Sequence, residues 1–120
     1  MGQPAIRVKY PVSSAHWSPL MPDILDELQA TINERKRNPK PGSYTNRLLD
    51  EGLNRIAQKV GEEAVEVVVS ALGQEREQQI GELCDLFYHS LVLMAALDIT
   101  IYDVFAELER RHKPSQGSAP

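Results

Sequence analysis

The chain has 120 residues, of which 42% are hydrophobic and 25% charged, a composition that suits one globular domain with a modest core and excludes a disordered chain. Its net charge of -4 and its pI of about 5.3 argue against general nucleic-acid binding, which needs an excess of lysine and arginine. No apolar run approaches the roughly 20 residues that cross a bilayer, and the single cysteine excludes an intrachain disulfide, so a cytoplasmic protein without a membrane contact is expected.

The two ends of the chain differ in pattern from its middle. Residues 1–20 carry prolines and no helical period, although "AIRVKY" alternates as a short strand would, so this segment is interpreted as an N-terminal extension. Residues 114–120 are small and polar, which predicts a flexible tail. Between these segments, residues 21–113 are predicted to form one helical domain.

The first three predicted helices follow one another closely. Apolar residues at helical spacing predict a helix over residues 23–37, which "NPKPG" ends. A short helix follows, with Ser43 or Thr45 as its N-cap. A long helix is then predicted over residues 53–72, with Gly73 as a left-handed stop.

The second half of the domain is more apolar than the first. A helix predicted over residues 75–97 is almost wholly apolar after Leu86, and such a helix must be surrounded by others. After a break near Asp98, Thr100 is the expected cap of a last helix. Its expected inner residues are Tyr102, Val104, Phe105 and Leu108. The fold predicted is an all-α bundle of four or five helices, completed by dimerisation because one chain cannot cover so apolar a central helix.

Acidic residues gather on one face of the helix predicted over residues 53–72. In "KVGEEAVE", Lys59, Glu62, Glu63 and Glu66 share a face that borders the apolar stripe. Like charges one turn apart repel, and a single lysine cannot balance three carboxylates. Taken alone, this pattern still favours a solvated helix face over a binding site.

The next helix changes that balance. "ELCDLFYHS" places Glu82, Asp85 and His89 on one face among apolar neighbours, where burying two acids costs several kcal/mol unless a cation is bound. Two such helices side by side predict an oxygen cage for Mg²⁺, with Mn²⁺ as a possible substitute. His89 alone is interpreted as a hydrogen-bonded core histidine and Cys84 as a small buried hydrophobe.

The segments "GSYTNRLLDEGLNRIAQKVGEEAVEVVVSA" and "ELCDLFYHSLVLMAALDITIYDVFAELERRH" closely resemble the phosphoribosyl-ATP pyrophosphatase family, within the all-α, MazG-like nucleoside triphosphate pyrophosphohydrolases. The resemblance covers about residues 23–113. It implies Mg²⁺-dependent hydrolysis of 1-(5-phosphoribosyl)-ATP to 1-(5-phosphoribosyl)-AMP and pyrophosphate, the second step of L-histidine biosynthesis. The implied metal ligands are Glu63, Glu66, Glu82 and Asp85, with Glu62 as a further ligand or as the group that orients water.

The resemblance also implies a substrate-binding segment and partners. Lys59 and Arg47 would meet phosphate oxygens, and His89 would either support the metal-binding helix or touch substrate. The "SYTN" residues implied in substrate binding are Ser43, Tyr44, Thr45 and Asn46. Members of the family associate at least as dimers. Many are fused to phosphoribosyl-AMP cyclohydrolase, and because this sequence shows no such domain, a separate cyclohydrolase is expected to take the product.

Two alternatives stay open at this point. The first is a house-cleaning pyrophosphohydrolase that acts on dUTP or damaged nucleotides with the same metal cage. The second is a non-enzymatic helical module that binds a metal. Di-iron bundles use paired E-x-x-H motifs, and neither acidic cluster supplies one, which counts against the second alternative.

Overall fold

The computed structural model describes residues 23–113 and confirms the all-α class, with no strand in that part of the chain. The predicted extension with its strand, over residues 1–20, and the predicted tail, over residues 114–120, lie outside the described residues. The helices are α1 (Ile24–Arg37), α2 (Tyr44–Glu51), α3 (Leu53–Gly73), α4 (Arg76–Ala96) and α5 (Ile101–His112).

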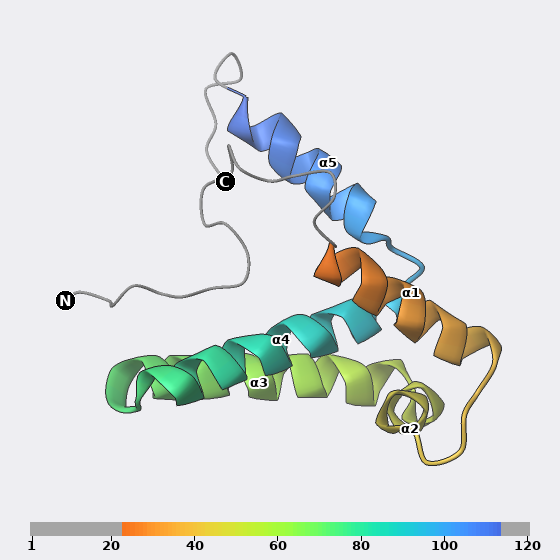
Figure 1. Cartoon of the computed structure of the whole chain (residues 1–120), viewed down its shortest axis with the longest axis horizontal. Helices are drawn as coiled ribbons and strands as arrows, with labels where there is room; N and C mark the ends of the chain where they lie inside the picture. The colour runs from red at the N-terminus through yellow and green to blue at the C-terminus, as the bar shows by residue number, and fades with distance from the viewer. Residues whose placement is uncertain (1–22, 114–120) are drawn as a thin grey trace.

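The two longest helices, α3 and α4, form an antiparallel pair that is the main packing unit of the molecule (Figure 1). The short helix α2 packs at one end of this pair, and α1 lies against α4. The last helix, α5, contacts α1 and leads away from the α3–α4 pair (Figure 1). None of the helices within residues 23–113 is both long enough and apolar enough to cross a membrane.

One small apolar core joins all five helices, because each contributes at least one fully buried side chain. The core residues are Ile32, Leu48, Ile56, Leu91, Val92, Ala95 and Ile101. Three of them come from the C-terminal half of α4, the part that the sequence marks as most apolar. The core therefore lies where α1, α2 and the first half of α3 surround that half of α4.

Two predicted caps are present in the structure. The Ser43 hydroxyl accepts a hydrogen bond from the Asn46 amide at 3.1 Å and begins α2. Thr100 and Asp103 cap α5 reciprocally, each side chain accepting from the backbone amide of the other residue. The predicted break near Asp98 is also confirmed, since Asp98 has a φ of 58°. Helix ends were predictable here because each depends on a few neighbouring residues.

The prediction of a left-handed stop at Gly73 is wrong. Gly73 is the last residue of α3, and the chain leaves the helix through Gln74, whose φ of -121° is extended. The end of α3 is satisfied instead by a side chain, because the Gln79 amide nitrogen donates to the carbonyls of Ser70 and Gln74 at 3.1 and 3.2 Å. A capping box between Glu75 and Gln78 then starts α4 at once.

Two burial predictions are also wrong for the single chain. Cys84 is exposed instead of buried, because the helices of one chain do not cover its position on α4. In α5 only Ile101 is buried, since this helix packs mainly against α1 and leaves much of its apolar face open. The residues expected inside but exposed are Tyr102, Val104, Phe105 and Leu108.

Candidate active site

Three carboxylates from α3 and α4 converge in the structure. Glu63 on α3 and Glu82 and Asp85 on α4 each offer an oxygen, and these oxygens lie within 4.8 Å of one another. Glu63 and Glu82 are half-buried and Asp85 is exposed. We call these three residues the carboxylate trio. The arrangement arises because the α3–α4 pair brings the two predicted acidic faces together.

The trio is electrostatically strained in the absence of a cation. The pKa of the Glu82 carboxyl is raised by partial burial and then by the negative charges of Glu66, Asp85 and Glu63. Glu66 therefore lies close enough to act on Glu82, although it is outside the trio. An all-oxygen donor set under mutual repulsion fits a hard divalent cation, which would remove the repulsion.

Glu62 is oriented differently from Glu63. Its carboxylate accepts a hydrogen bond from the Gln58 side chain at 2.8 Å, and this bond, followed by the one with Lys59, lowers the pKa of Glu62. Arg55 also lies 3.9 Å from the same carboxylate. The structure thus places Glu62 beside the trio, among basic and amide groups.

Lys59 links these glutamates. Its ammonium lies 3.3 Å from Glu63 and 3.4 Å from Glu62, and its side chain is only 19% exposed. The hydrogen bond with Glu63 is the largest cause of the raised pKa of Lys59, so the cation is held firmly in its charged form. A fixed positive charge next to the trio is suited to meet a phosphate oxygen.

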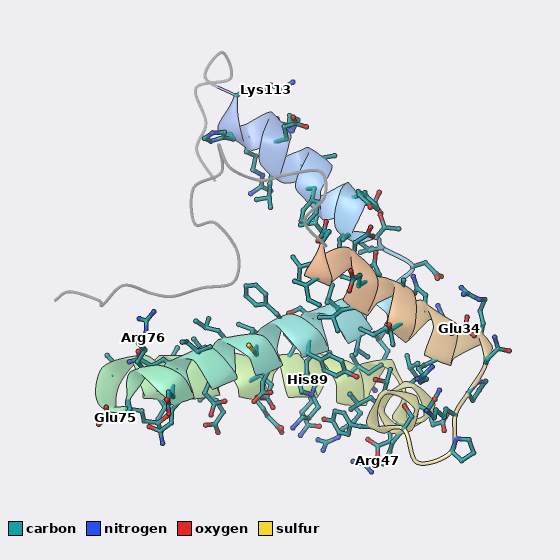
Figure 2. All side chains as sticks on the ribbon, viewed as in Figure 1. Glu34, Arg47, Glu75, Arg76, His89 and Lys113 are labelled. Carbon is teal, nitrogen blue, oxygen red and sulfur yellow. The ribbon has the colours of Figure 1, made fainter. Side chains whose placement is uncertain are left out.

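The first turn of α2 reaches this site through Tyr44. The Tyr44 hydroxyl lies 2.8 Å from Nε2 of His89, a buried residue of α4. Arg47 stacks its guanidinium over the Tyr44 ring at 5.1 Å from the ring centroid. His89 and Arg47 both lie toward the end of the α3–α4 pair where α2 packs (Figure 2).

The rest of the "SYTN" segment makes contacts within the chain. Ser43 serves as the cap of α2, and the Thr45 hydroxyl is hydrogen-bonded to the hydroxyl of Tyr88. The Asn46 side chain donates to the carbonyl of Arg35 and accepts from the amide of Lys40, both at 2.8 Å. These contacts bring Arg35 and Lys40 to the site, and the sequence interpretation missed both residues. The one available signal was the Pro-Gly turn just before "SYTN", which places basic residues beside that segment.

The fold and the carboxylate trio define an all-α protein equipped to hold a hard divalent cation next to fixed positive charges. Comparison with known proteins is more specific. Residues 25–112 match the family described as phosphoribosyl-ATP pyrophosphohydrolase. The chain belongs to this family, as the sequence resemblance predicted.

Individual relatives agree with the family match. The chain is 50% identical over 90 residues to a phosphoribosyl-ATP pyrophosphatase of Pyrobaculum aerophilum, covering 75% of this chain and 96% of the relative. It is also 50% identical over 91 residues to the enzyme of that name from Sulfurisphaera tokodaii, covering 76% of this chain and 97% of the relative.

Other relatives are longer. The chain is 45% identical over 91 residues to a histidine biosynthesis bifunctional protein HisIE of Caldanaerobacter subterraneus subsp. tengcongensis. That match covers 76% of this chain but only 44% of the relative. The chain therefore spans less than half the length of these bifunctional relatives and nearly the whole length of the shorter ones.

Proposed function

We propose that this chain hydrolyses phosphoribosyl-ATP to phosphoribosyl-AMP and pyrophosphate, as a step of histidine biosynthesis. Family membership supports the substrate, because relatives that the chain covers almost end to end carry the name phosphoribosyl-ATP pyrophosphatase. The carboxylate trio is the observation that carries the chemistry, since cleaving a phosphoanhydride requires charge neutralisation and an activated water.

The cofactor in this proposal is Mg²⁺, with Mn²⁺ able to replace it. Glu63, Glu82 and Asp85 would hold the ion, and Glu66 is near enough to Glu82 to join them. When bound, the ion would draw negative charge from the phosphates and lower the pKa of a bound water. Carboxylate oxygens without histidine or cysteine ligands favour these hard ions over zinc.

The chain's own residues would orient the substrate and the water. Lys59 would donate to a phosphate oxygen, since its ammonium is already held beside the trio. Glu62 lies next to Lys59 with a lowered pKa, so it stays ionised and can accept a hydrogen bond from the attacking water. Arg47, held over the Tyr44 ring, is a second candidate for phosphate contact.

We also propose that the protein acts as a homo-oligomer, at least a dimer, in which two copies cover each other's exposed apolar residues. The second half of α3 exposes apolar side chains at i, i+3, i+4 and i+7 spacing, and α4 exposes them from its first half to its middle at i, i+3 and i+7 spacing, the pattern of a helix–helix contact. These residues, the apolar stripes, are Val65, Val68, Val69 and Leu72 on α3 and Ile80, Leu83 and Phe87 on α4. A phosphoribosyl-AMP cyclohydrolase would then receive the product.

The proposed activity is tested by measuring pyrophosphate release with Mg²⁺ from phosphoribosyl-ATP, ATP and dUTP. We expect a clear preference for phosphoribosyl-ATP and no release after chelation of the metal. Turnover of dUTP at an equal or greater rate would contradict the assignment and favour a house-cleaning enzyme. No release from any of the three would favour a binding module.

A matched pair of variants tests the trio in the same assay. Glu63→Gln is expected to lower turnover by at least about 100-fold and to weaken Mg²⁺ binding in calorimetry, because a ligand charge is lost. Glu109→Gln makes the same chemical change at an exposed position of α5 and is expected to match the wild type. Wild-type Mg²⁺ affinity in Glu63→Gln would refute the role of the trio.

A further inference from the structure

A pocket of about 410 Å³ lies between α1, α2 and the turn that connects them. Arg35 in the last turns of α1 and Lys40 in the turn line it, together with the first turn of α2 and Tyr88 of α4. We call it the basic pocket, because its lining includes these two cations and no carboxylate.

The two cations of the basic pocket have no carboxylate partner within the described residues. Neighbouring cations of α1 are engaged: Lys36 pairs with Asp98 at 2.9 Å and Arg37 pairs with Glu34 at 2.8 Å. Within residues 23–113, the side chains of Arg35 and Lys40 take part in no ion pair. Arg35 acts electrostatically inside the pocket, since its charge opposes the rise in the pKa of Tyr88 that burial and Tyr44 cause.

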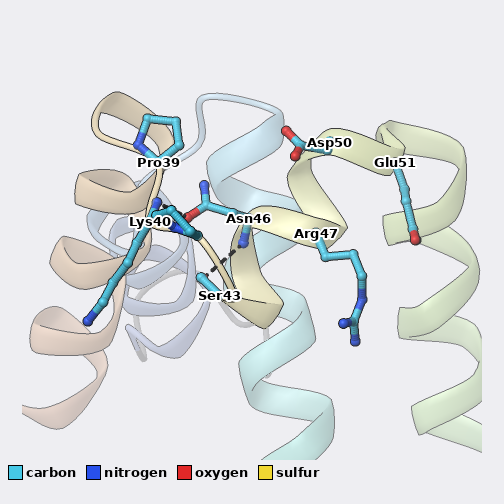
Figure 3. A pocket seen from close by; sticks show the side chains of 9 residues that line it. Pro39, Lys40, Ser43, Asn46, Arg47, Asp50 and Glu51 are labelled. Carbon is cyan, nitrogen blue, oxygen red and sulfur yellow. Dashed lines mark hydrogen bonds between the residues drawn. The ribbon is translucent and has the colours of Figure 1, made fainter.

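The backbone around the pocket is held in place before any ligand binds. The Ser43 amide donates to the Lys40 carbonyl at 3.1 Å, and Gly42 has a φ of 81°, the pattern of a type II turn with Pro41 at its second position. Asn46, 7% exposed, fixes both sides, because its amide bonds the backbone of Arg35 and of Lys40. Figure 3, which draws the lining of a neighbouring pocket, shows Asn46 bonded to Lys40 of the turn and to Ser43.

The pocket also offers hydroxyl groups. Thr45 and Tyr88 are hydrogen-bonded to each other, and such a pair uses only one of its two hydroxyl hydrogens. The second hydrogen has no acceptor among residues 23–113, so it can be donated to a ligand. Two cations with a spare hydroxyl donor in a preformed pocket suit a phosphate monoester, which carries nearly two negative charges at neutral pH.

The basic pocket is connected to the carboxylate trio but distinct from it. Tyr44 lines the pocket, and its hydroxyl reaches His89 on α4, whose ring bonds the backbone of Asp85. A substrate that reaches from the basic pocket to the carboxylate trio must carry anionic groups at two places. Phosphoribosyl-ATP does, because its triphosphate and the phosphate of its phosphoribosyl group stand at opposite ends of the molecule.

We propose that the basic pocket binds the phosphate of the phosphoribosyl group, while the triphosphate lies at the carboxylate trio. The assignment rests on the proposed function for the identity of the substrate. It makes Arg35 and Lys40 residues that determine specificity, because ATP and dUTP have no group to place between them. Asn46 is then a positioning residue, since both ends of its side-chain amide are occupied by backbone.

Kinetics of three variants test the proposal. Arg35→Gln and Lys40→Gln are each expected to raise KM for phosphoribosyl-ATP about tenfold, equal to about 1.4 kcal/mol of binding, and to change kcat by less than about twofold. Arg37→Gln removes a charge from the same helix end outside the pocket and is expected to leave both constants unchanged. A wild-type KM in both pocket variants would overturn the proposal.

Binding measurements separate failure of this assignment from failure of the proposed function. Ribose 5-phosphate, with uncharged ribose as control, is titrated into isotope-labelled protein, and the amide signals of Gly42 and Thr45 are followed. We expect shifts in the wild type and in Arg37→Gln, and none in the Arg35→Gln, Lys40→Gln double variant. Equal shifts in the wild type, in Arg37→Gln and in the double variant would overturn the proposal that the basic pocket binds phosphate, even if the enzyme is active. The absence of shifts in the wild type would overturn it as well.

The affinity for ATP shows which part of the substrate occupies the basic pocket, the triphosphate or the phosphate of the phosphoribosyl group. If the pocket holds the phosphoribosyl phosphate, ATP binds the wild type and the double variant equally well. An equal loss of affinity for ATP and for phosphoribosyl-ATP would place the triphosphate in the pocket and overturn the assignment.

Discussion

His89 connects two parts of the candidate site through its ring nitrogens. A backbone carbonyl can only accept, so the 2.7 Å contact with the Asp85 carbonyl places a proton on Nδ1. In the neutral ring Nε2 is then an acceptor, and the Tyr44 hydroxyl donates to it. The prediction of a hydrogen-bonded core histidine is confirmed. Its predicted contact with substrate stays a prediction, and both nitrogens already have partners in the chain.

The contact between Tyr44 and His89 is expected to stabilise the docking of α2 on α4. Tyr44→Phe removes only the hydroxyl and is expected to lower the free energy of unfolding in urea by about 1 kcal/mol. In a His89→Ala background the same change is expected to cost much less, because the acceptor is already gone. Equal costs in both backgrounds would show that the hydrogen bond contributes nothing.

Residue identities in the site were only partly predictable from sequence. Spacing on two helices was enough to bring Glu63, Glu82 and Asp85 together, because helical periodicity fixes which side chains share a face. It could not separate Glu62 from Glu63, since that difference depends on the side-chain contacts of Gln58 and Lys59. The basic pocket depends on contacts across a turn, for which periodicity gives no signal.

At the scale of elements, capping and periodicity rules predicted the helices well. They failed where a side chain from another helix, instead of a neighbouring residue, satisfies the backbone at a helix end. Ser43 and Thr100 act as caps, as their sequence positions indicated. The end of α3 escaped prediction because Gln79, from the next helix, satisfies its carbonyls. The attachment of α5 escaped prediction for the same reason, since it depends on Gln29 of α1.

Gln29 fastens the start of α5 to α1. Its side-chain oxygen accepts from the Ile101 amide at 2.9 Å, its nitrogen donates to the Ile99 carbonyl at 3.4 Å, and the residue is 5% exposed. Gln29→Ala would leave the buried Ile101 amide without this partner. We expect a loss of about 1–3 kcal/mol in the free energy of unfolding, measured in urea.

Glu27→Ala, an exposed change on the same helix, provides the comparison and is expected to stay within about 0.5 kcal/mol of the wild type. A Gln29→Ala variant as stable as this control would mean that the two Gln29 hydrogen bonds do not hold α5 on α1, leaving its apolar contacts and the hydrogen bond from Tyr102 to Asp26.

At the scale of the whole molecule, the packed core and the exposed apolar surface occupy different ends of the α3–α4 pair. The buried core residues of α4 lie in its C-terminal half, whereas the apolar stripes lie toward the loop between α3 and α4. Along the sequence, Glu63 lies just before the α3 stripe, and Glu82 and Asp85 lie within the α4 stripe. The proposed contact between copies would therefore border the active site.

A charge in the apolar stripes is expected to separate the copies. Phe87 is 53% exposed in the single chain, and Phe87→Glu would place a carboxylate inside the proposed contact, where desolvation opposes association. Light scattering coupled to size-exclusion chromatography is expected to give at least twice the 13.5 kDa chain mass for the wild type and the single-chain mass for Phe87→Glu. Ala30→Glu, the same added charge on the exposed side of α1, is expected to keep the wild-type mass.

Because the stripes flank Glu63 and Glu82, turnover should fall with the mass in Phe87→Glu and stay unchanged in Ala30→Glu. A wild type that elutes as a single chain at micromolar concentration would exclude the proposed oligomer, and full activity in a monomeric Phe87→Glu would show that one chain makes the whole site.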